Sequence, residues 1–377
     1  MKAHVLYGVN DLRYESAQRP VPGKGEVLLK VDAVGICGSD IPRIYETGAH
    51  RHPLIPGHEF AGTICEVGEG VKEDTAKDIK EGKRVGVFPL IPCGECGPCK
   101  NKQYEMCRNY NYLGSRCDGG FAEYVKVPVW NLIELPDSVS FEDAAMLEPA
   151  SVGAHAMRRM FAEDGFVFGD GSDSAHSNND NDALETILNK SVAVIGLGTI
   201  GLLLTMHLIG SGFRNIYVVG NKDFQREKAL GLGIKPENYC DSRKDNTVEW
   251  LLEKTSGTGV EAVFECVGKN VTYSQAVESA APAGKVMIVG NPASDMMLEK
   301  NIYWKILRNQ ITVIGTWNSS FTGGIDDDWH YVVNKLAAGE IKPSQLISHR
   351  IKLDELEKGL HIMRDKTEDY VKVMVVQ

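Results

Sequence analysis

The feature that most constrains the fold of this chain is the run SVAVIGLGTIGLLLTMHLIG at residues 191–210, where three closely spaced glycines interrupt an apolar stretch. The part before the glycines has the continuous apolar character of a strand buried on both faces, and the part after them is long enough for a helix. Strand-like and helical segments then alternate through NIYVVG, FQREKALGLG, VEAVFECVG, YSQAVESAA, KVMIVG and QITVIGTW. This alternation predicts an α/β domain with a parallel, doubly wound sheet over residues 156–316.

The three glycines form a GxGxxG motif in the strand-turn-helix context that dinucleotide binding requires. They permit a tight turn and a close backbone approach, and the N-terminus of the following helix attracts a pyrophosphate. We therefore expect a dinucleotide to contact the whole turn, which comprises Gly196, Leu197, Gly198, Thr199, Ile200 and Gly201.

The end of the next predicted strand indicates which nicotinamide cofactor is used. An NAD-specific fold normally places Asp or Glu there, on the ribose 2′-hydroxyl. Here the strand runs into Gly220, Asn221 and Lys222. Because no carboxylate would repel a 2′-phosphate, and because Lys222 with Arg226 could neutralise it, the sequence favours NADP over NAD. A strand that ends slightly later would bring Asp223 to this corner and favour NAD.

A cluster of four cysteines lies in IPCGECGPCKNKQYEMC. Cys93, Cys96, Cys99 and Cys107 have the spacing CxxCxxCx7C. Thiolates this close can surround one ion completely, which is typical of a structural zinc site. An iron–sulfur cluster is the rival interpretation, but the ferredoxin pattern has its fourth cysteine sooner and then a proline, whereas Arg108 follows here. The spacing predicts a structural zinc lobe over residues 91–108.

Residues 35–62 offer a second set of metal ligands. Cys37 supplies a thiolate, and His58 and Glu59 supply an imidazole beside a carboxylate. Zinc prefers such ligands, and a site with three protein ligands leaves a coordination position for substrate. A buried cysteine and a hydrogen-bonded histidine are the alternative interpretation. Glu148, just before a predicted helix break at Pro149, is a further candidate ligand, although a glutamate in a helical segment is usually solvated.

The remaining segments predict a second, β-rich domain. Strand-like runs between residues 3 and 34, and glycines every few residues up to residue 90, are typical of a small, strongly bent barrel. After Trp317 the alternation stops, and the tail is too short for a core of its own. We therefore predict that residues 1–155 and 317–377 form one domain. Residues 161–190, where seven acids face one lysine, are predicted to be a solvated insertion in which His176 is a surface residue.

Charge and cysteine content exclude several classes of function. The net charge is -10 and there is no long basic run, which argues against nucleic acid or an anionic membrane as the main partner. No apolar run approaches the roughly 18 residues of a membrane span, and the first residues do not resemble a signal peptide. We therefore expect a cytoplasmic protein, in which nine cysteines indicate metal binding or catalysis rather than disulfides.

The order of these motifs resembles that of the zinc-dependent medium-chain alcohol and polyol dehydrogenases over nearly the full chain. The matching features are Cys37, GHE at 57–59, the four-cysteine lobe, EP at 148–149 and GLGTIG at 196–201. The resemblance implies a bent, GroES-like β-barrel catalytic domain plus a Rossmann domain. It also implies two zinc ions per chain and a homodimer or homotetramer.

What the resemblance implies for the site is a catalytic zinc held by Cys37 and His58 together with a carboxylate. Glu59 and Glu148 both match glutamates that lie at the metal, and which of them ligates is left open. Ser39 matches the hydroxyl that relays the substrate proton. Sorbitol-type relatives often carry a histidine three residues later, and this chain has Pro42 there.

The expected reaction is hydride transfer between a secondary alcohol and NAD(P), which interconverts alcohol and ketone. Segments such as CGSDIPRIYETGAH and KILRNQ resemble those of polyol-phosphate dehydrogenases, which implies a substrate such as galactitol 1-phosphate. Candidate cations for its phosphate are Arg43, His50, Arg116 and Lys305, with Arg51, His52 and Arg308 as further possibilities. A sorbitol, threonine or secondary-alcohol dehydrogenase acting on an unphosphorylated substrate is the alternative, and a non-catalytic zinc-binding family member is a remote one.

Overall fold

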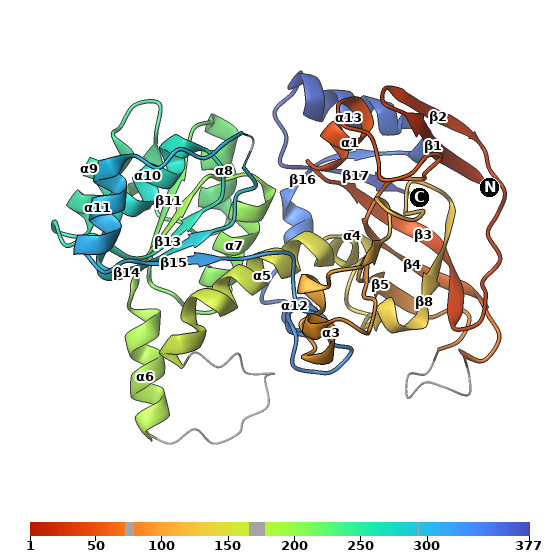
Figure 1. Cartoon of the computed structure of the whole chain (residues 1–377), viewed down its shortest axis with the longest axis horizontal. Helices are drawn as coiled ribbons and strands as arrows, with labels where there is room; N and C mark the ends of the chain where they lie inside the picture. Colours follow the sequence, from red (N-terminus) through yellow and green to blue (C-terminus); the bar gives the residue numbers. More distant parts are fainter. Residues whose placement is uncertain (72–78, 166–177, 293) are drawn as a thin grey trace. The chain divides into compact units, whose positions relative to one another are not determined.

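The computed structural model describes residues 1–71, 79–165, 178–292 and 294–377 (Figure 1). Contacts divide the chain into two compact units, one formed by Met1–Ser151 with Ser319–Gln377 and the other by Val152–Asn318. The sequence places these boundaries at residues 155 and 317. No helix in the described part of the chain is both long enough and apolar enough to cross a membrane.

The unit Val152–Asn318 is built on a six-stranded sheet in the order β12-β11-β10-β13-β14-β15, and all neighbouring strands are parallel. From β10 the chain winds first to one side and then to the other, which confirms the predicted doubly wound α/β fold. The strands are β10 (Ser191–Ile195), β11 (Asn215–Gly220), β12 (Tyr239–Asp241), β13 (Val260–Glu265), β14 (Ala280–Ile288) and β15 (Thr312–Gly315). The helices are α6 (Asn178–Leu188), α7 (Thr199–Gly210), α8 (Asp223–Gly231), α9 (Thr247–Lys254), α10 (Asn270–Ser279) and α11 (Lys300–Arg308).

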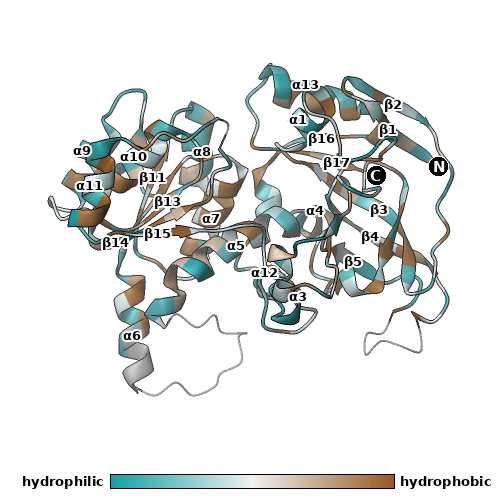
Figure 2. Ribbon diagram, viewed as in Figure 1, coloured by the Kyte–Doolittle hydropathy of each residue, from teal (hydrophilic) through white to brown (hydrophobic). Residues whose placement is uncertain are grey.

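The core of this unit explains why the glycine-flanked run folds as it does. Ala193 and Ile195 of β10 are fully buried with Val263 of β13 and Val286 of β14. Residues 201–208 of α7 are buried on every side, as expected of a helix that is apolar all round. Figure 2 shows brown, hydrophobic ribbon along the strands of this sheet. The phosphate-binding turn is therefore held between a buried strand and a buried helix.

The other unit is organised around β3 (Glu26–Ile36), which is antiparallel to three strands, β17, β4 and β8. The path of its seven-stranded sheet is β16-β17-β3-β4-β5-β9, with β8 beside β3. Register shifts on β3 between Leu28 and Leu29 and between Val31 and Ala33 bend the sheet. The strands are β1 (Lys2–Gly8), β2 (Asp11–Ser16), β4 (Glu59–Val67), β5 (Arg84–Val87), β6 (Leu90–Ile91), β7 (Asn111–Tyr112), β8 (Tyr124–Pro128), β9 (Leu132–Glu134), β16 (Ile347–Ile351) and β17 (Lys372–Val376). The helices are α1 (Asp40–Tyr45), α3 (Gly97–Lys100), α4 (Phe141–Ala145), α12 (Asp328–Ala337) and α13 (Leu356–Asp365).

The helix break predicted at Pro149 lies three residues earlier. The α4 helix ends at Ala145, and α5 (Leu147–Phe161) begins after Met146 and runs through Pro149. A proline in the first turn of a helix removes an N–H that has no partner within the helix, so it is tolerated there. Glu148 therefore lies in the first turn of α5.

Part of the predicted acidic insertion, including His176, lies outside the described residues. Within 161–190 the structure describes a short 3-10 helix at Ala162–Asp164 and the helix α6. In this part Arg214 binds Glu185 at 2.6 Å, and Lys190 binds Asp164 at 3.1 Å. These ion pairs lie within the unit that carries the insertion.

Candidate active site and metal centres

Cys37, His58 and Glu59 come together because β3 and β4 are antiparallel neighbours. Gly35 of β3 is paired with Glu59, so Cys37, just past the end of β3, lies beside His58, just before β4. The ligand atoms of the three side chains lie within 4.8 Å of one another, and His58 and Glu59 are buried. A thiol, an imidazole and a carboxylate at this separation fit a zinc ion.

Asp40, the first residue of α1, contacts two of these residues. Its buried carboxylate accepts a hydrogen bond from Cys37 N at 3.0 Å and lies 3.5 Å from His58 Nδ1. It is also ion-paired with Arg43. Burial would raise the pKa of Asp40, but the charges of His58 and Arg43 outweigh this effect and the pKa is lowered. The carboxylate thus lies close to His58 Nδ1, which makes no hydrogen bond in the described structure.

Glu148 lies beside this cluster under Tyr112. Its carboxyl group is buried and accepts a hydrogen bond from Tyr112 Oη at 3.1 Å. Burial raises the pKa of Glu148 to about 7, and the charges of His58 and Glu59 also act on it. The Tyr112 ring lies edge-on to the His58 ring, with 5.8 Å between centroids. The two glutamates therefore share one buried region with Cys37 and His58.

A buried lysine binds the other glutamate. Lys372 on β17 donates a hydrogen bond to Glu59 Oε2, and the two side chains are only 3% and 2% exposed. Burial alone would lower the pKa of Lys372, but the charges of Glu59 and Cys37 outweigh it and the pKa is raised. The Lys372 ammonium therefore lies buried against the Glu59 carboxylate.

Ser39 lies at the edge of the cluster, where its Oγ donates to Cys37 Sγ at 3.3 Å. The predicted proton relay would start from this hydroxyl. In sorbitol-type relatives a histidine at position 42 would receive the proton next. Pro42 offers only its carbonyl, which accepts hydrogen bonds from Glu46 N at 2.9 Å and Thr47 N at 2.8 Å. The side chain of residue 42 therefore cannot carry a proton onward.

The four cysteines of the lobe are gathered around a common centre. Cys96 Sγ lies 3.4 Å from Cys99 Sγ and 3.9 Å from Cys107 Sγ, and Cys93 Sγ lies 3.9 Å from Cys99 Sγ. Four sulfurs at about 2.3 Å from one zinc ion would be about 3.8 Å apart, so the spacing fits. Backbone N–H groups of Arg108 and Cys99 lower the pKa of Cys96 to about 6. The donor set therefore fits a closed, structural zinc site.

The GxGxxG turn has the geometry that a pyrophosphate needs. Gly196 has φ of 98°, which favours glycine, and a Cβ atom on Gly201 would overlap the Gly196 carbonyl. Gly198 is the N-cap of α7 and supplies no capping side chain, so the end of the helix stays open to an anion. Nearby, a pocket of about 250 Å³ is lined by Gly268 and Gly290, just past β13 and β14. Ligands of open α/β sheets bind at this edge.

The segment that follows β11 carries both positively and negatively charged side chains. Lys222 is the N-cap of α8, and its Nζ lies 5.2 Å from the centre of the Phe224 ring. Asp223, the residue that could favour NAD, binds Arg243 at 2.5 Å, and Arg243 also binds Asp241 at 2.7 Å. These hydrogen bonds hold the pKa of Asp241 well below its usual range. Arg243 is a cation of this corner that the sequence did not single out.

The predicted substrate cations divide into two groups. Burial lowers the pKa of His50, and the charges of Arg116 and Arg43 lower it further. The Arg116 guanidinium lies 4.6 Å from the centre of the Tyr110 ring, and its buried Nε has no hydrogen-bond partner in the described structure. Lys305 belongs to the other unit, on α11, and donates to the Glu278 carbonyl at 3.1 Å.

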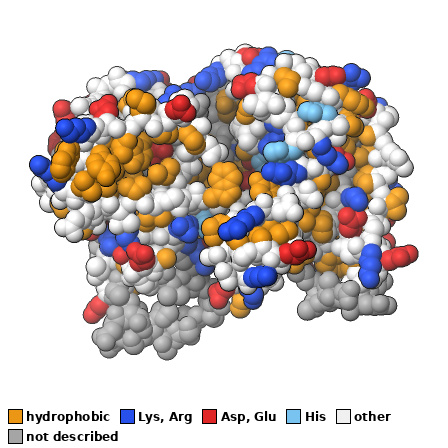
Figure 3. Space-filling model, viewed as in Figure 1, with side chains coloured by type: hydrophobic (Ala, Val, Ile, Leu, Met, Phe, Trp, Pro, Cys, Tyr) orange, Lys and Arg blue, Asp and Glu red, His pale blue; other side chains and the backbone are white. Residues whose placement is uncertain are grey.

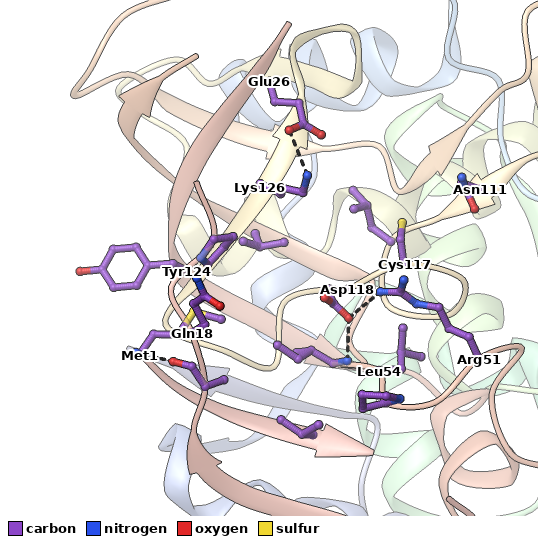
Figure 4. Close-up of a pocket in the computed structure, with 18 of the residues that line it drawn as sticks. Met1, Gln18, Glu26, Arg51, Leu54, Asn111, Cys117, Asp118, Tyr124 and Lys126 are labelled. Carbon is purple, nitrogen blue, oxygen red and sulfur yellow. Dashed lines mark hydrogen bonds and ion pairs between the residues drawn. The ribbon is translucent and has the colours of Figure 1, made fainter. Parts of the chain in front are cut away.

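A cavity of about 690 Å³ lies in the β-rich unit and is not lined by the three clustered ligands (Figure 4). Two ion pairs are formed by residues that line it. Arg51 binds Asp118 at 3.0 Å, and Lys126 binds Glu26 at 3.1 Å. Because these charges satisfy one another, we assign no ligand to this cavity.

A bent β unit with a Cys/His/Glu cluster, joined to a doubly wound unit with a dinucleotide turn, defines a metal-dependent dehydrogenase. Two family models match: the alcohol dehydrogenase GroES-like domain over residues 23–137, and the zinc-binding dehydrogenase model over residues 199–338. The chain belongs to the zinc-dependent medium-chain dehydrogenase family. The predicted family, fold class and enzyme class are confirmed.

Curated relatives within this family have several substrates. The chain is 32% identical to galactitol 1-phosphate 5-dehydrogenase of Escherichia coli (strain K12), over 89% of this chain and 88% of that one. It is 28% identical to sorbitol dehydrogenase of Bacillus subtilis (strain 168), over 100% and 97% of the two chains. It is 30% identical to L-threonine 3-dehydrogenase of Pyrococcus abyssi, over 97% and 94%.

Solved structures show the same fold. Galactitol-1-phosphate dehydrogenase from Escherichia coli superposes with a TM-score of 0.84 at 28% identity, and all of both chains is covered. A zinc-binding dehydrogenase from Sinorhizobium meliloti 1021 bound to NADP gives a TM-score of 0.83 at 27% identity, with 100% of this chain and 99% of that chain covered.

Four residues near the candidate sites were missed by the sequence: Asp40, Tyr112, Lys372 and Arg243. Asp40 carried a signal, since it lies in the segment CGSDIPRIYETGAH, which was singled out for other residues. Lys372 carried none, because only strand pairing brings a residue near the C-terminus beside Glu59.

Proposed function

We propose that this enzyme interconverts a secondary alcohol and a ketone on a polyol, by hydride transfer to or from a nicotinamide cofactor. The observation that carries the proposal is the approach of the Cys37, His58 and Glu59 ligand atoms to within 4.8 Å of one another. That group is mostly buried in the unit that also holds the cysteine lobe.

Cys37 and His58, with Glu59 or Glu148, would hold a catalytic zinc, and the four-cysteine lobe a structural one. When bound, the catalytic zinc supplies a Lewis acid that makes the substrate hydroxyl more acidic, and the nicotinamide supplies the hydride acceptor. All nine cysteines are free in the structure. We keep the cytoplasm as the proposed compartment, because thiols remain reduced there.

Ser39 would accept the proton of the substrate hydroxyl and pass it on. Its present hydrogen bond to Cys37 Sγ, at 3.3 Å, places the hydroxyl directly beside the proposed metal ligand. Because Pro42 has no titratable side chain, the proton would leave from Ser39 through water. This differs from a relay through a histidine at position 42.

A polyol phosphate, such as galactitol 1-phosphate, is the proposed substrate. Arg116 supports it, since its guanidinium has no carboxylate partner in the described structure, and its charge and that of Arg43 both act on His50. Phosphate is the ligand that such a cluster of cations would bind through charge-assisted hydrogen bonds. The relative that is 32% identical acts, by its name, on galactitol 1-phosphate.

An unphosphorylated polyol or amino alcohol is the second candidate substrate. Arg43 is already paired with Asp40, and Lys305 is already bonded to the Glu278 carbonyl. These two cations are thus less available to a phosphate than the sequence suggests. Sorbitol and threonine dehydrogenases among the relatives represent this alternative.

NADP remains the favoured cofactor. Lys222 and Arg226 follow β11, and the competing acid Asp223 is neutralised by Arg243. A ribose 2′-phosphate would therefore meet a net cationic corner. NAD would need a free carboxylate at the end of β11.

We also propose a homo-oligomer, because one edge of the six-stranded sheet is exposed. β15 is the last strand of that sheet, and Val313 on it is exposed. The neighbouring helix α11 exposes Tyr303, Trp304 and Leu307, and Figure 3 shows hydrophobic side chains gathered over it. An exposed edge beside an apolar helix face suits pairing with a second copy.

The proposal is tested by metal analysis and one substrate panel. We expect about two zinc ions per chain. Galactitol 1-phosphate, galactitol, sorbitol and threonine should each be assayed with NADP and with NAD. The highest kcat/KM for galactitol 1-phosphate with NADP would support the full proposal. Equal or better turnover of the free polyols would overturn the proposal of a phosphorylated substrate. No oxidation of any alcohol by the zinc-loaded protein would overturn the polyol reaction itself.

A further inference from the structure

A buried tyrosine on β12 reaches the end of β11, the edge of the sheet where the ribose of a dinucleotide would lie. Tyr239 is the first residue of β12 and is paired with Val218 of β11. Its side chain is buried, and its hydroxyl donates a hydrogen bond to the Lys222 carbonyl at 3.3 Å. Burial raises the pKa of Tyr239 to about 12, so the hydroxyl stays a protonated donor at neutral pH.

The same hydroxyl fills the space beside Gly220, the last residue of β11. A Cβ atom on Gly220 would lie 2.7 Å from Tyr239 Oη, and it would lie only 3.1 Å from Gln225 Oε1. Gln225 is itself held in place, because its Oε1 accepts a hydrogen bond from Asn221 N at 3.0 Å. The backbone of Gly220 is not in the left-handed region, so the glycine is required for space rather than for conformation.

This filled space bears on the choice of cofactor. An NAD-specific fold places Asp or Glu at the end of the second strand, where its carboxylate binds the ribose 2′-hydroxyl. That strand ends at Gly220, and Tyr239 Oη lies against the position that the first side-chain atom of such an acid would take. The hydroxyl is the end of a rigid, buried ring, so it has little freedom to move aside. Packing therefore opposes an acid at position 220.

Tyr239 also contacts both cations that are proposed to bind a 2′-phosphate. The Lys222 carbonyl accepts a hydrogen bond from Arg226 N at 3.2 Å as well as from the tyrosine, so the tyrosine braces the first turn of α8. The Arg226 guanidinium lies 6.0 Å from the centre of the Tyr239 ring, a distance at which a cation and an aromatic face still attract each other. The contact to Lys222 is the one that depends on the hydroxyl.

We infer that Tyr239 is a specificity-determining residue for the cofactor: its hydroxyl keeps a carboxylate from the end of β11 and positions Lys222 for a ribose 2′-phosphate. The inference rests on the proposed preference for NADP. It has two consequences that can be measured separately. Loss of the hydroxyl weakens the binding of the 2′-phosphate, and it also makes room for an acid at position 220.

The first test is Tyr239→Phe, which keeps the ring and removes only the hydroxyl. Isothermal titration calorimetry on the zinc-loaded protein measures the Kd of 2′,5′-ADP, which carries the 2′-phosphate, and of 5′-AMP, which lacks it. We expect the Kd of 2′,5′-ADP to rise about three- to tenfold, the effect of one neutral hydrogen bond, and the Kd of 5′-AMP to change by less than about twofold. Tyr217→Phe is the matched control, because the Tyr217 hydroxyl of β11 donates to the Lys254 carbonyl at 3.4 Å, and it should change neither Kd.

The second test adds Gly220→Asp. Alone, this substitution should weaken the binding of both fragments, because the new side chain has no room. Combined with Tyr239→Phe, it should bind 5′-AMP about tenfold more tightly than Gly220→Asp alone, since the acid then reaches the ribose 2′-hydroxyl. Tyr239→Phe by itself gives no such gain. The gain is therefore a coupling between the two positions, which a general loosening of the fold would not produce.

The outcomes separate this inference from the proposed function. The same Kd for 2′,5′-ADP in Tyr239→Phe and Tyr217→Phe would overturn the positioning of Lys222. A double variant that binds 5′-AMP no better than Gly220→Asp alone would overturn the steric role. If the wild-type protein binds 5′-AMP as tightly as 2′,5′-ADP, then the proposed preference for NADP fails and the inference fails with it, while the proposed polyol reaction and zinc site stand.

Discussion

The Tyr112 hydroxyl donates a 3.1 Å hydrogen bond to the buried carboxyl group of Glu148. This contact opposes the effect of burial, which raises the pKa of Glu148 to about 7, because a donor favours the ionised carboxylate. Tyr112 thus links β7 of the β-rich unit to the first turn of α5. Its effect on metal binding can be measured.

Tyr112→Phe removes the donor and keeps the ring. The pKa of Glu148 should rise further, so more of it is protonated near pH 7 and less is available to a metal. A hydrogen bond to a charged group contributes about 1.5–3 kcal/mol, so zinc affinity at the catalytic site should fall roughly 10-fold to 100-fold. Competition with a chelator measures the affinity. Tyr110→Phe, which keeps the ring that Arg116 contacts, is the control, and equal affinities in both variants would contradict this role of Tyr112.

Lys222→Ala should separate the two nicotinamide cofactors. If Lys222 binds the 2′-phosphate, the KM for NADPH should rise about tenfold or more, while the KM for NADH changes little. Lys228→Ala, on the same helix, should affect neither. A similar change in both KM values would favour NAD as the natural cofactor.

Arg243→Ala should have a different effect at the same corner. Removal of Arg243 frees Asp223, which it binds at 2.5 Å, and the released carboxylate can accept the ribose 2′-hydroxyl of NAD. The ratio of kcat/KM with NAD to kcat/KM with NADP should therefore rise by roughly tenfold, the effect of about one charged hydrogen bond. A ratio that stays the same would show that Asp223 does not reach the cofactor.

The elements that the sequence predicted well are those whose chemistry is local. The GxGxxG turn combines a strand, three glycines and a helix within twenty residues, and the cysteine lobe gathers its four thiols within one short segment. In both cases short-range sterics and ligand spacing decide the structure, so the pattern alone is informative.

The parts that the sequence could not predict depend on register between distant strands. Glu59 and Lys372 are 313 residues apart in the chain and meet only because β17 returns to the edge of β3. An isolated lysine in KVMVV gives no sign of that partner. Likewise, the pairing of Asp223 with Arg243 requires β11 and β12 to be neighbours, which a pattern of alternating strands and helices does not specify.

The edge of the six-stranded sheet leads to a prediction about assembly. Leu307, half-exposed on α11, should lie in an interface between two copies of the chain. Leu307→Lys would place a charge there and should convert the oligomer to monomer, because unpaired buried charges oppose association strongly. Light scattering after size-exclusion chromatography measures the mass. Val21→Lys, an exposed apolar residue of the other unit, should leave it unchanged, and a monomeric wild-type protein would contradict the proposal.

His4 on β1 should make the β-rich unit sensitive to acid. Its buried ring lies against the Leu353 carbonyl, 2.7 Å from Nε2, and its buried Nδ1 has no hydrogen-bond partner in the described structure. Burial therefore lowers the pKa of His4 below 6.5 in the folded state. The unfolded chain then binds a proton that the folded chain does not, so the contribution of His4 to stability is complete above about pH 6.5 and falls as the pH drops toward the folded pKa.

His4→Gln keeps an N–H donor for the Leu353 carbonyl but does not titrate. Urea unfolding at about pH 7.5 and about pH 5.5 should show a larger loss of unfolding free energy in the wild-type protein than in the variant. An equal loss in both proteins would assign the acid sensitivity to other groups.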